Sequence, residues 1–280
     1  MDRLPAESLE SVRGALREDR ASEDVTTRLL GGAAEQSAMA RLVAEDEFVV
    51  AGLPLAAAVF RELDPGAQLS ESAEGEWARP GDIIAAIRGR AGAILSAERV
   101  ALNFVQRLSG IATATRRAVA AVAGTSAQIT HTRKTTPGLR ALEQYAIRVG
   151  GGVDNRASLA DAVLWKDNHW ALLAQSGRSF ADALRDAASN TPVIVEVEND
   201  AQLEEALAAG VTHLLVDNQS PEQVAAWVRR AGPGIIIQAS GGITLENARA
   251  YAEAGANLIA IGALTHSASA VPITCEIVND

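Results

Sequence analysis

Short apolar runs alternate with amphipathic stretches through the second half of the chain. Runs of strand length begin at residues 126, 162, 193, 212, 234 and 257. Helix signals lie between them, such as Asp200 before AQLEEALAAG and the sequence SPEQ at 220–223, in which serine caps a helix that proline begins. This alternation predicts a parallel sheet covered by helices, in either an open α/β fold or a β/α barrel.

The first hundred residues follow a different pattern. Leu9, Val12 and Leu16 have helical spacing, and shorter runs punctuated by glycine and proline follow, as expected for strands and turns around a helix. A long, largely apolar helix is then predicted from about residue 96 to Gly124. The pattern therefore predicts two domains, an N-terminal α/β domain over 1–110 and a helix-covered sheet domain over 111–280.

The amino-acid composition and charge limit the classes of partner that the protein could bind. The 280-residue chain has a formal charge of −10 and no extended Lys/Arg block, which argues against a nucleic-acid or membrane surface. Its one cysteine, Cys275, rules out an intramolecular disulfide framework, and the start of the chain lacks the apolar segment of a signal peptide. We therefore expect a cytoplasmic protein in which any bound anion meets a local cluster of cations.

Polar and glycine-rich residues follow each of the six predicted strands. In parallel α/β folds the carboxyl ends of the strands form the ligand-binding edge. Taken singly, each of these residues has an ordinary explanation as a solvated loop cation, a helix-start carboxylate or a turn glycine, and His213 within a run is better explained as a packed side chain. Taken together they predict one site, formed by Arg133, Lys134, Lys166, His169, Glu198, Asp217, Ser240, Gly241, Gly242, Gly262 and His266.

The residue types indicate what that site would bind. Arginine and lysine suit carboxylates and phosphates, and Arg156 adds a further cation. Glycine-rich turns that lead from strands toward helices expose backbone N–H groups to a phosphate. Glu198 and Asp217 are hard oxygen ligands for Mg²⁺ or acceptors for ribose hydroxyls. The combination favours a phosphorylated sugar that carries pyrophosphate, together with an acidic co-substrate.

Several long motifs carry a family resemblance. TRKTTPGLRALEQYAIRVGGG, KDNH, VEVE, LLVDN, ASGGIT and IGALTHS, with AERVALNFVQRLSGIAT upstream and EDVTT near residue 23, occur in order from about residue 20 to 270. At these motifs the chain resembles quinolinate phosphoribosyltransferase, the decarboxylating nicotinate-nucleotide pyrophosphorylase family. An ordered set of this length is far more specific than any single glycine pattern.

The resemblance implies a type II phosphoribosyltransferase, with an N-terminal α/β sandwich domain over 1–110 and an incomplete β/α barrel over 111–280. A C-terminal tail at about 270–280 is expected to pack back on the N-terminal domain. The family assembles as a homodimer with shared active sites, and a higher oligomer is also compatible. The implied reaction joins N1 of quinolinate to C1 of phosphoribosyl pyrophosphate (PRPP) with Mg²⁺, and gives nicotinate mononucleotide, pyrophosphate and CO2 for NAD biosynthesis.

The resemblance also implies roles, carried over motif by motif. Lys134, Lys166, Glu198 and Asp217 are the implied catalytic residues, with Glu198 and Asp217 as the Mg²⁺ ligands. The two carboxylates and part of the sugar diphosphate would be held by cations, and the 5-phosphate by the residues of the last two motifs. The implied substrate-binding set is Arg99 from the partner subunit, Arg133, Lys134, Asn155, Arg156, Lys166, His169, Glu198, Asp217, Ser240, Gly241, Gly242, Gly262 and His266.

Three residues depart from the usual family pattern and keep alternatives open. His131 stands where aspartate is usual, Asn155 where histidine is usual, and Gln238 where glutamate is usual. Asn155 prompts the alternative of a paralogue that acts on a different heteroaromatic acid. A barrel lyase with Lys166 as Schiff-base nucleophile is a remote second alternative, and a non-catalytic phosphate-binding module a third.

Overall fold

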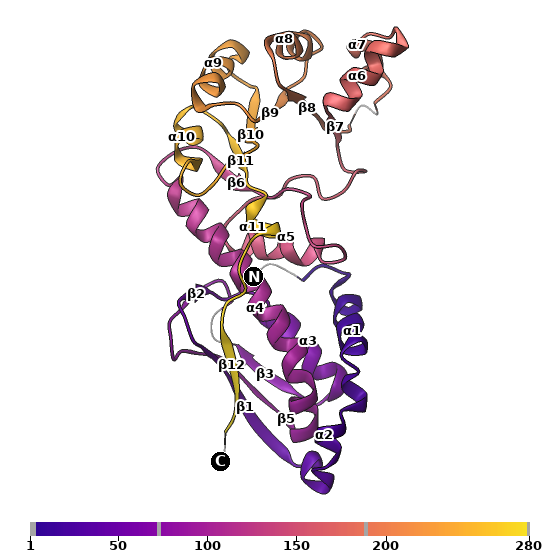
Figure 1. The fold of residues 1–280 in the computed structure, drawn as a ribbon, viewed down its shortest axis with the longest axis vertical. Coiled ribbons are helices and arrows are strands. Elements are labelled where there is room, and N and C mark those ends of the chain that lie inside the picture. The colour runs from indigo at the N-terminus through magenta and orange to yellow at the C-terminus, as the bar shows by residue number, and fades with distance from the viewer. Residues whose placement is uncertain (1–3, 72–73, 188–189, 279–280) are drawn as a thin grey trace. The chain divides into compact units, whose positions relative to one another are not determined.

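The computed structural model describes residues 4–71, 74–187 and 190–278 (Figure 1). The chain forms two compact units, and each is assembled from separated stretches of sequence. The first unit comprises Met1–Arg116, Thr135–Gly151 and Leu264–Asp280, and the second comprises Arg117–Lys134 and Gly152–Ala263. Segments from the middle and the end of the chain therefore complete the N-terminal unit.

An antiparallel sheet organises the first unit. Its strand order is β12-β1-β5-β3, with β1 at Ser37–Ala44, β3 at Gln68–Glu71, β5 at Ile83–Arg90 and β12 at Ile273–Val278. The last strand pairs with the first, from Met39 opposite Val278 to Ala44 opposite Ile273. The C-terminal residues thus extend the N-terminal sheet. Two short strands, β2 at Phe48–Val49 and β4 at Trp77–Ala78, form a separate pair.

Helices complete this unit. The predicted N-terminal helix is confirmed as α1, Ser8–Glu18, which buries Val12 and Leu16. The long helix is confirmed as α4, Ala91–Ala121, and it begins earlier than predicted. The other helices of the unit are α2 at Val25–Arg28, α3 at Leu53–Leu63 and α5 at Arg140–Val149, with 3-10 turns η1 at Ala21–Glu23 and η2 at Gly31–Glu35. Helix α11 runs from Ala263 to His266.

The second unit contains the predicted parallel sheet, in the order β6-β11-β10-β9-β8-β7. The strands are β6 at Gln128–Thr130, β7 at Val163–Trp165, β8 at Val193–Val197, β9 at His213–Asp217, β10 at Ile236–Ser240 and β11 at Leu258–Ala260. β6 and β7 are the two ends of this order and do not pair with each other. The sheet is therefore an open, incomplete β/α barrel.

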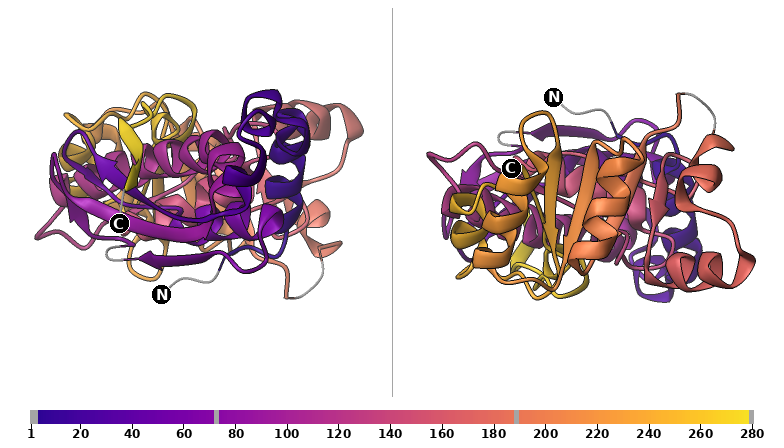
Figure 2. Two further views of the ribbon diagram at one scale, coloured as in Figure 1. Left: turned by 90° about the horizontal axis from the view of Figure 1, so that it is seen from below. Right: turned by 90° about the horizontal axis from the view of Figure 1, so that it is seen from above.

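In the part of the chain that the structure describes, the helices that accompany this sheet are α6 at Asp167–Ser176, α7 at Phe180–Arg185, α8 at Asp200–Ala208, α9 at Pro221–Ala231 and α10 at Ala248–Glu253. Figure 2 shows helices on the outer side of the strands. The Ser220 hydroxyl accepts a hydrogen bond from the Gln223 N–H at 3.3 Å, which confirms the predicted start of α9. Within the described residues, no helix is both long and apolar enough to cross a membrane.

Candidate functional site

A cavity of about 360 Å³ opens at the carboxyl ends of the parallel strands of the second unit. Strands β7, β8, β9, β10 and β11 and the loop after β6 all contribute to it. This is the edge at which the strand-end residues were expected to meet. The lining residues are Thr132, Arg133, Lys134, Asn155, Arg156, Leu164, Lys166, Ile194, Glu196, Leu215, Asp217, Gln238, Ser240 and Ala260.

The cavity gathers four cations. Arg133, Lys134, Arg156 and Lys166 all line it. Burial lowers the pKa of the Arg156 guanidinium, and the nearby charge of Arg133 lowers it further. The buried Nε of Arg133 has no hydrogen-bond partner in the described part of the chain. Two arginines that repel each other, one with an unpaired N–H, form a site that a bound anion would stabilise.

Glu196 supplies a buried carboxylate at the floor of this cavity. It is 5% exposed and forms an ion pair with Lys166. Burial raises the pKa of Glu196, the Lys166 ammonium opposes that rise, and the charges of Asp217 and Asp167 add to it. Sequence reasoning placed this role two residues later, at Glu198. The signal for Glu196 was a single acidic residue inside an otherwise apolar strand, where an unpaired charge is costly.

Asn218, which directly follows β9, holds Asp217 and Ser240 in place. The Asn218 side-chain amide donates to Asp217 Oδ2 at 2.6 Å, and its backbone N–H donates to the Ser240 carbonyl at 3.0 Å. Asn218 has a φ of +53°, a left-handed conformation that asparagine tolerates better than most residues. The cavity carboxylate of Asp217 is thereby fixed at the end of β9.

Gly241 makes this arrangement possible. It has a φ of +83°, and an added Cβ would lie 2.6 Å from the backbone nitrogen of Asn218. We expect G241A to displace Asn218 and lower the kcat/KM for the phosphate-bearing substrate about tenfold or more, because small misplacements in a site are costly. Steady-state kinetics on the purified variant would measure this loss.

Gly234 provides a matched control. Its φ is +88°, and an added Cβ would meet nothing within 4 Å. G234A should carry a similar backbone cost of about 1–2 kcal/mol and a lower melting temperature. Its kcat/KM should stay at the wild-type value. Equal kinetic losses in the two variants would contradict the role given to the close approach at Gly241.

Not every expected site residue lines the cavity. Arg133, Lys134, Asn155, Arg156, Lys166, Asp217 and Ser240 do, whereas His169, Glu198, Gly241, Gly242 and Gly262 belong to the second unit but are absent from the lining. His169 Nδ1 accepts from the backbone N–H of Lys166 at 3.0 Å and so helps to start α6. Arg99 and His266 belong to the first unit.

Gln238, one of the family departures, also lines the cavity and is 1% exposed. Its side-chain oxygen lies 3.0 Å from His213 Nε2. Burial lowers the pKa of His213, with Gln238 opposing that effect. His213 is half-buried, and it bonds to Gln238 on the neighbouring strand β10, as expected for a packed histidine.

The acidic residues near the strand ends offer few ligands for a metal ion in the described part of the chain. Among the described residues, no group of three or more His, Cys, Asp or Glu side chains gathers around one point. Glu198 directly follows Val197, which pairs with Val216 next to Asp217, and Gln219 donates to the backbone carbonyls of both acidic residues at 3.3 Å. One or two carboxylates completed by substrate phosphates and water are enough for Mg²⁺.

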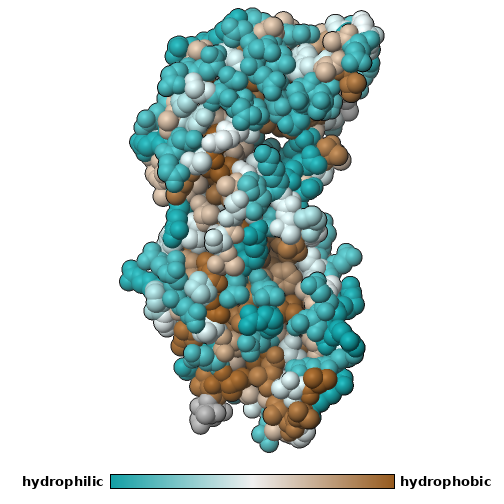
Figure 3. All heavy atoms as spheres, viewed as in Figure 1, coloured by the Kyte–Doolittle hydropathy of each residue, from teal (hydrophilic) through white to brown (hydrophobic). Residues whose placement is uncertain are grey.

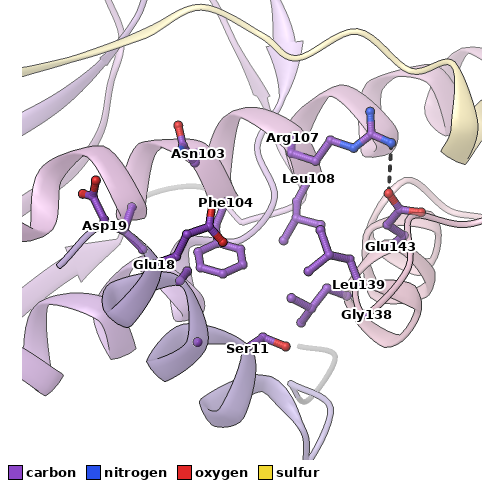
Figure 4. A pocket seen from close by; sticks show the side chains of 14 residues that line it. Ser11, Glu18, Asp19, Asn103, Phe104, Arg107, Leu108, Gly138, Leu139 and Glu143 are labelled. Atoms are coloured by element: carbon purple, nitrogen blue, oxygen red, sulfur yellow. Dashed lines mark hydrogen bonds and ion pairs between the residues drawn. The ribbon is translucent and has the colours of Figure 1, made fainter. Parts of the chain in front are cut away.

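The first unit contains a different kind of cavity, of about 470 Å³, between α1, α4 and the start of α5 (Figure 4). Phe104, Leu108 and Leu139 contribute apolar surface to it. Arg107 is the one cation among the described residues that line it, and its Nη2 lies 2.9 Å from Glu143 Oε1. This cavity lacks the cation cluster of the second unit.

An open β/α barrel with four cations at its strand ends defines an enzyme site for small polyanions. Models of known protein families identify the enzyme family to which this site belongs. The model for the quinolinate phosphoribosyl transferase C-terminal domain matches residues 111–276, and the model for the N-terminal domain matches residues 24–109. The chain belongs to the quinolinate phosphoribosyltransferase family.

Individual relatives agree with this assignment. The chain is 40% identical over 261 residues to the probable nicotinate-nucleotide pyrophosphorylase [carboxylating] of Bacillus subtilis, with 93% of this chain and 90% of that protein covered. It is 39% identical over 278 residues to the Mycobacterium leprae enzyme, with 96% of each chain covered. The crystal structure of NadC from Streptococcus pyogenes superposes with a TM-score of 0.92 at 35% identity and covers 100% of both chains.

Proposed function

We propose that the protein transfers the phosphoribosyl group of PRPP to N1 of quinolinate and releases the 2-carboxylate as CO2. The products are nicotinate mononucleotide, pyrophosphate and CO2, and the pathway is NAD biosynthesis. The observation that carries the proposal is the convergence of Arg133, Lys134, Arg156 and Lys166 on one cavity, in a chain with an overall charge of −10. Both substrates are polyanions that this cluster suits.

The proposed chemistry needs no general base in its first step. The lone pair of the ring nitrogen forms the bond to C1 while the bond from C1 to the pyrophosphate oxygen breaks, and both electrons leave with pyrophosphate. Cations of the cavity would neutralise the leaving group, and the Glu196 and Asp217 carboxylates would stabilise positive charge on the ribose. The bond from C2 to the carboxylate then breaks, its electrons stay at C2 beside the positive nitrogen, and C2 takes a proton.

Roles carried over from the family complete the proposal. Lys134, Lys166 and Asp217 would act on the reacting groups, with Glu196 added by its place in the cavity and Glu198 retained as a neighbour of Asp217. Asn155 and His169 would border the acid. Ser240, Gly241, Gly242 and Gly262 would hold the 5-phosphate. Mg²⁺ would be held by Asp217 and Glu198 with phosphate oxygens, and would neutralise the departing pyrophosphate.

A second copy of the chain is proposed to complete each site. Arg99 lines a cavity of about 450 Å³ in the first unit, together with Arg20, Arg28 and Leu95. Exposed apolar side chains lie in the same segments, with Val25 73% and Leu29 87% exposed. Figure 3 shows hydrophobic atoms at the end of the first unit that carries α2 in Figure 1. An apolar surface beside arginines suits burial against a partner that presents an anion-filled cavity.

The activity is tested by mass spectrometry of reactions that contain PRPP, Mg²⁺ and a panel of heteroaromatic acids. The proposal expects nucleotide, pyrophosphate and CO2 from quinolinate. A better acceptor elsewhere in the panel would favour a paralogue with another substrate, as Asn155 in the cavity would allow. Borohydride trapping of a covalent adduct at Lys166 would instead identify a Schiff-base lyase, and PRPP binding without pyrophosphate release would identify a binding module.

The shared site makes a separate prediction. R99A and R133A should each be inactive alone, because each removes a cation from every site. Mixed and reassociated in equal amounts, they should regain about a quarter of the wild-type activity, since half of the dimers would then carry one intact site of two. Activity that stays at the level of the single variants would contradict the borrowing of Arg99.

A further inference from the structure

A buried histidine lies directly behind the cation-lined cavity. His131 follows β6 and is 1% exposed, and it is not among the residues that line the cavity. Its neighbours Thr132, Arg133 and Lys134 do line the cavity. The imidazole therefore has no direct access to a ligand there, and its effect on a ligand would pass through other residues.

The contacts of His131 lead to Asn155. The backbone N–H of Asn155 donates to His131 Nε2 at 3.0 Å, and the Asn155 side-chain amide donates to the His131 carbonyl at 3.2 Å. Nε2 thus carries a lone pair and not a proton in this contact. Asp154 Oδ1 also lies near it, at 3.6 Å. One hydrogen bond joins the Asn155 backbone to the His131 side chain, and the other joins the Asn155 side chain to the His131 backbone. Together they fix Asn155 against the end of β6.

Asn155 in turn fixes the next residue. Its side-chain Oδ1 accepts from the backbone N–H of Arg156 at 2.8 Å. The Arg156 guanidinium is held by a weaker contact, from Nη1 to the Ala162 carbonyl at 3.3 Å. Residues 154–157 have no regular secondary structure. Without helix or strand bonds, the position of Arg156 is set by these contacts together with the attraction of the Asp161 carboxylate.

We propose that His131 is a positioning residue that sets the place of Arg156 in the cavity through Asn155. The inference rests on the proposed function, in which cations of this cavity hold the carboxylates of the acid, and it assigns that part to the mutually repelling pair Arg133 and Arg156. Those two guanidinium groups must keep a fixed spacing to bind two adjacent carboxylates together. On this assignment His131 controls the recognition of the acid, whereas the 5-phosphate end of PRPP, assigned above to the turns after β10 and β11, depends on it little.

Three substitutions separate positioning from packing. H131Q places an amide oxygen near the position of Nε2, so it keeps the acceptor for Asn155. H131N has a similar polarity but is too short to reach, and H131A removes the group. We expect H131A and H131N to raise the KM for the acid about tenfold to a hundredfold, with kcat and the KM for PRPP within about threefold of wild type. H131Q should stay within about threefold in all three constants.

A binding measurement without turnover accompanies the kinetics. Benzene-1,2-dicarboxylate has two adjacent carboxylates and no ring nitrogen, so it tests recognition alone in calorimetric titrations. H131A and H131N should weaken its binding by the same factor as the KM for the acid. N155A should cause at least as large a loss, because its side chain also borders the acid, and H131A/N155A should lose no more than N155A alone, since both substitutions break the same link.

The outcomes distinguish a failure of the proposed function from a failure of the positioning role of His131. If the wild-type enzyme neither binds benzene-1,2-dicarboxylate nor converts quinolinate, the proposed function fails and the inference falls with it. If wild type does both while H131N matches it, His131 has no positioning role. If H131Q and H131N show the same rise in both KM values and the same fall in kcat and in melting temperature, His131 contributes to packing only. H131Q and H131N decide the question even if H131A fails to fold.

Discussion

Replacing Arg133 by alanine is expected to lower kcat/KM for quinolinate by about two to three orders of magnitude, because the loss of one partner of a desolvated charge pair costs several kcal/mol. The Nε of Arg133 is buried without a hydrogen-bond partner in the described residues, and its charge already acts on Arg156. An anion bound in the cavity would give this N–H a partner and offset the repulsion between the two arginines. Steady-state kinetics with both substrates varied would measure the effect.

The thermal stability of the R133A variant should change in the opposite direction to its activity. R133A relieves the repulsion of Arg156 and removes an unpaired buried N–H, so the melting temperature of the free variant should equal or exceed that of wild type. R229A is the control, since Arg229 is an exposed arginine on α9 of the same unit. It should leave kcat/KM unchanged. A fully active R133A enzyme would show that the cavity is not the place where the anionic substrates react.

The parallel sheet could be predicted from the sequence because its strands are buried on both faces. Such strands appear in the sequence as continuous apolar runs separated by helical segments, and this alternation can be recognised without knowledge of the tertiary structure. Residues that follow β6 and β7, and the last residues of β9 and β10, meet in one cavity for the same reason, since parallel strands end at the same edge. Arg133, Lys166, Asp217 and Ser240 were found in this way.

Features that depend on distant contacts could not be predicted so directly. The pairing of β12 with β1 joins residues at opposite ends of the chain; the family resemblance implied that the tail packs on the N-terminal domain, but no local pattern encodes the pairing. Glu196 was missed because position after a strand was used as the signal, whereas its own position is inside β8. His131 appeared only as a family departure. Its link to Asn155 depends on the fold that brings residues 131 and 155 together.

Glu196 and Glu198 give the sharpest test of the cavity geometry. Glu196 is buried beside Lys166, and Glu198 is exposed and outside the cavity lining. We expect E196A to lower kcat by about two to three orders of magnitude, since it removes a carboxylate from the reacting centre and leaves the Lys166 charge without its partner. E198A should lower kcat less than about tenfold. Steady-state kinetics at saturating Mg²⁺ would measure both.

Titration with Mg²⁺ separates the two roles further. If Glu198 helps to hold the metal, E198A should need more Mg²⁺ for half-maximal activity and recover near wild-type kcat at saturation. E196A should stay slow at every Mg²⁺ concentration, because it loses the partner of Lys166 and the carboxylate proposed to stabilise the ribose. K166M/E196M replaces the whole pair with apolar side chains and should fold at least as well as E196A while remaining inactive. The reverse order of losses, with E198A slow at saturating Mg²⁺ and E196A active, would assign the reacting carboxylate to the end of β8 and not to its interior.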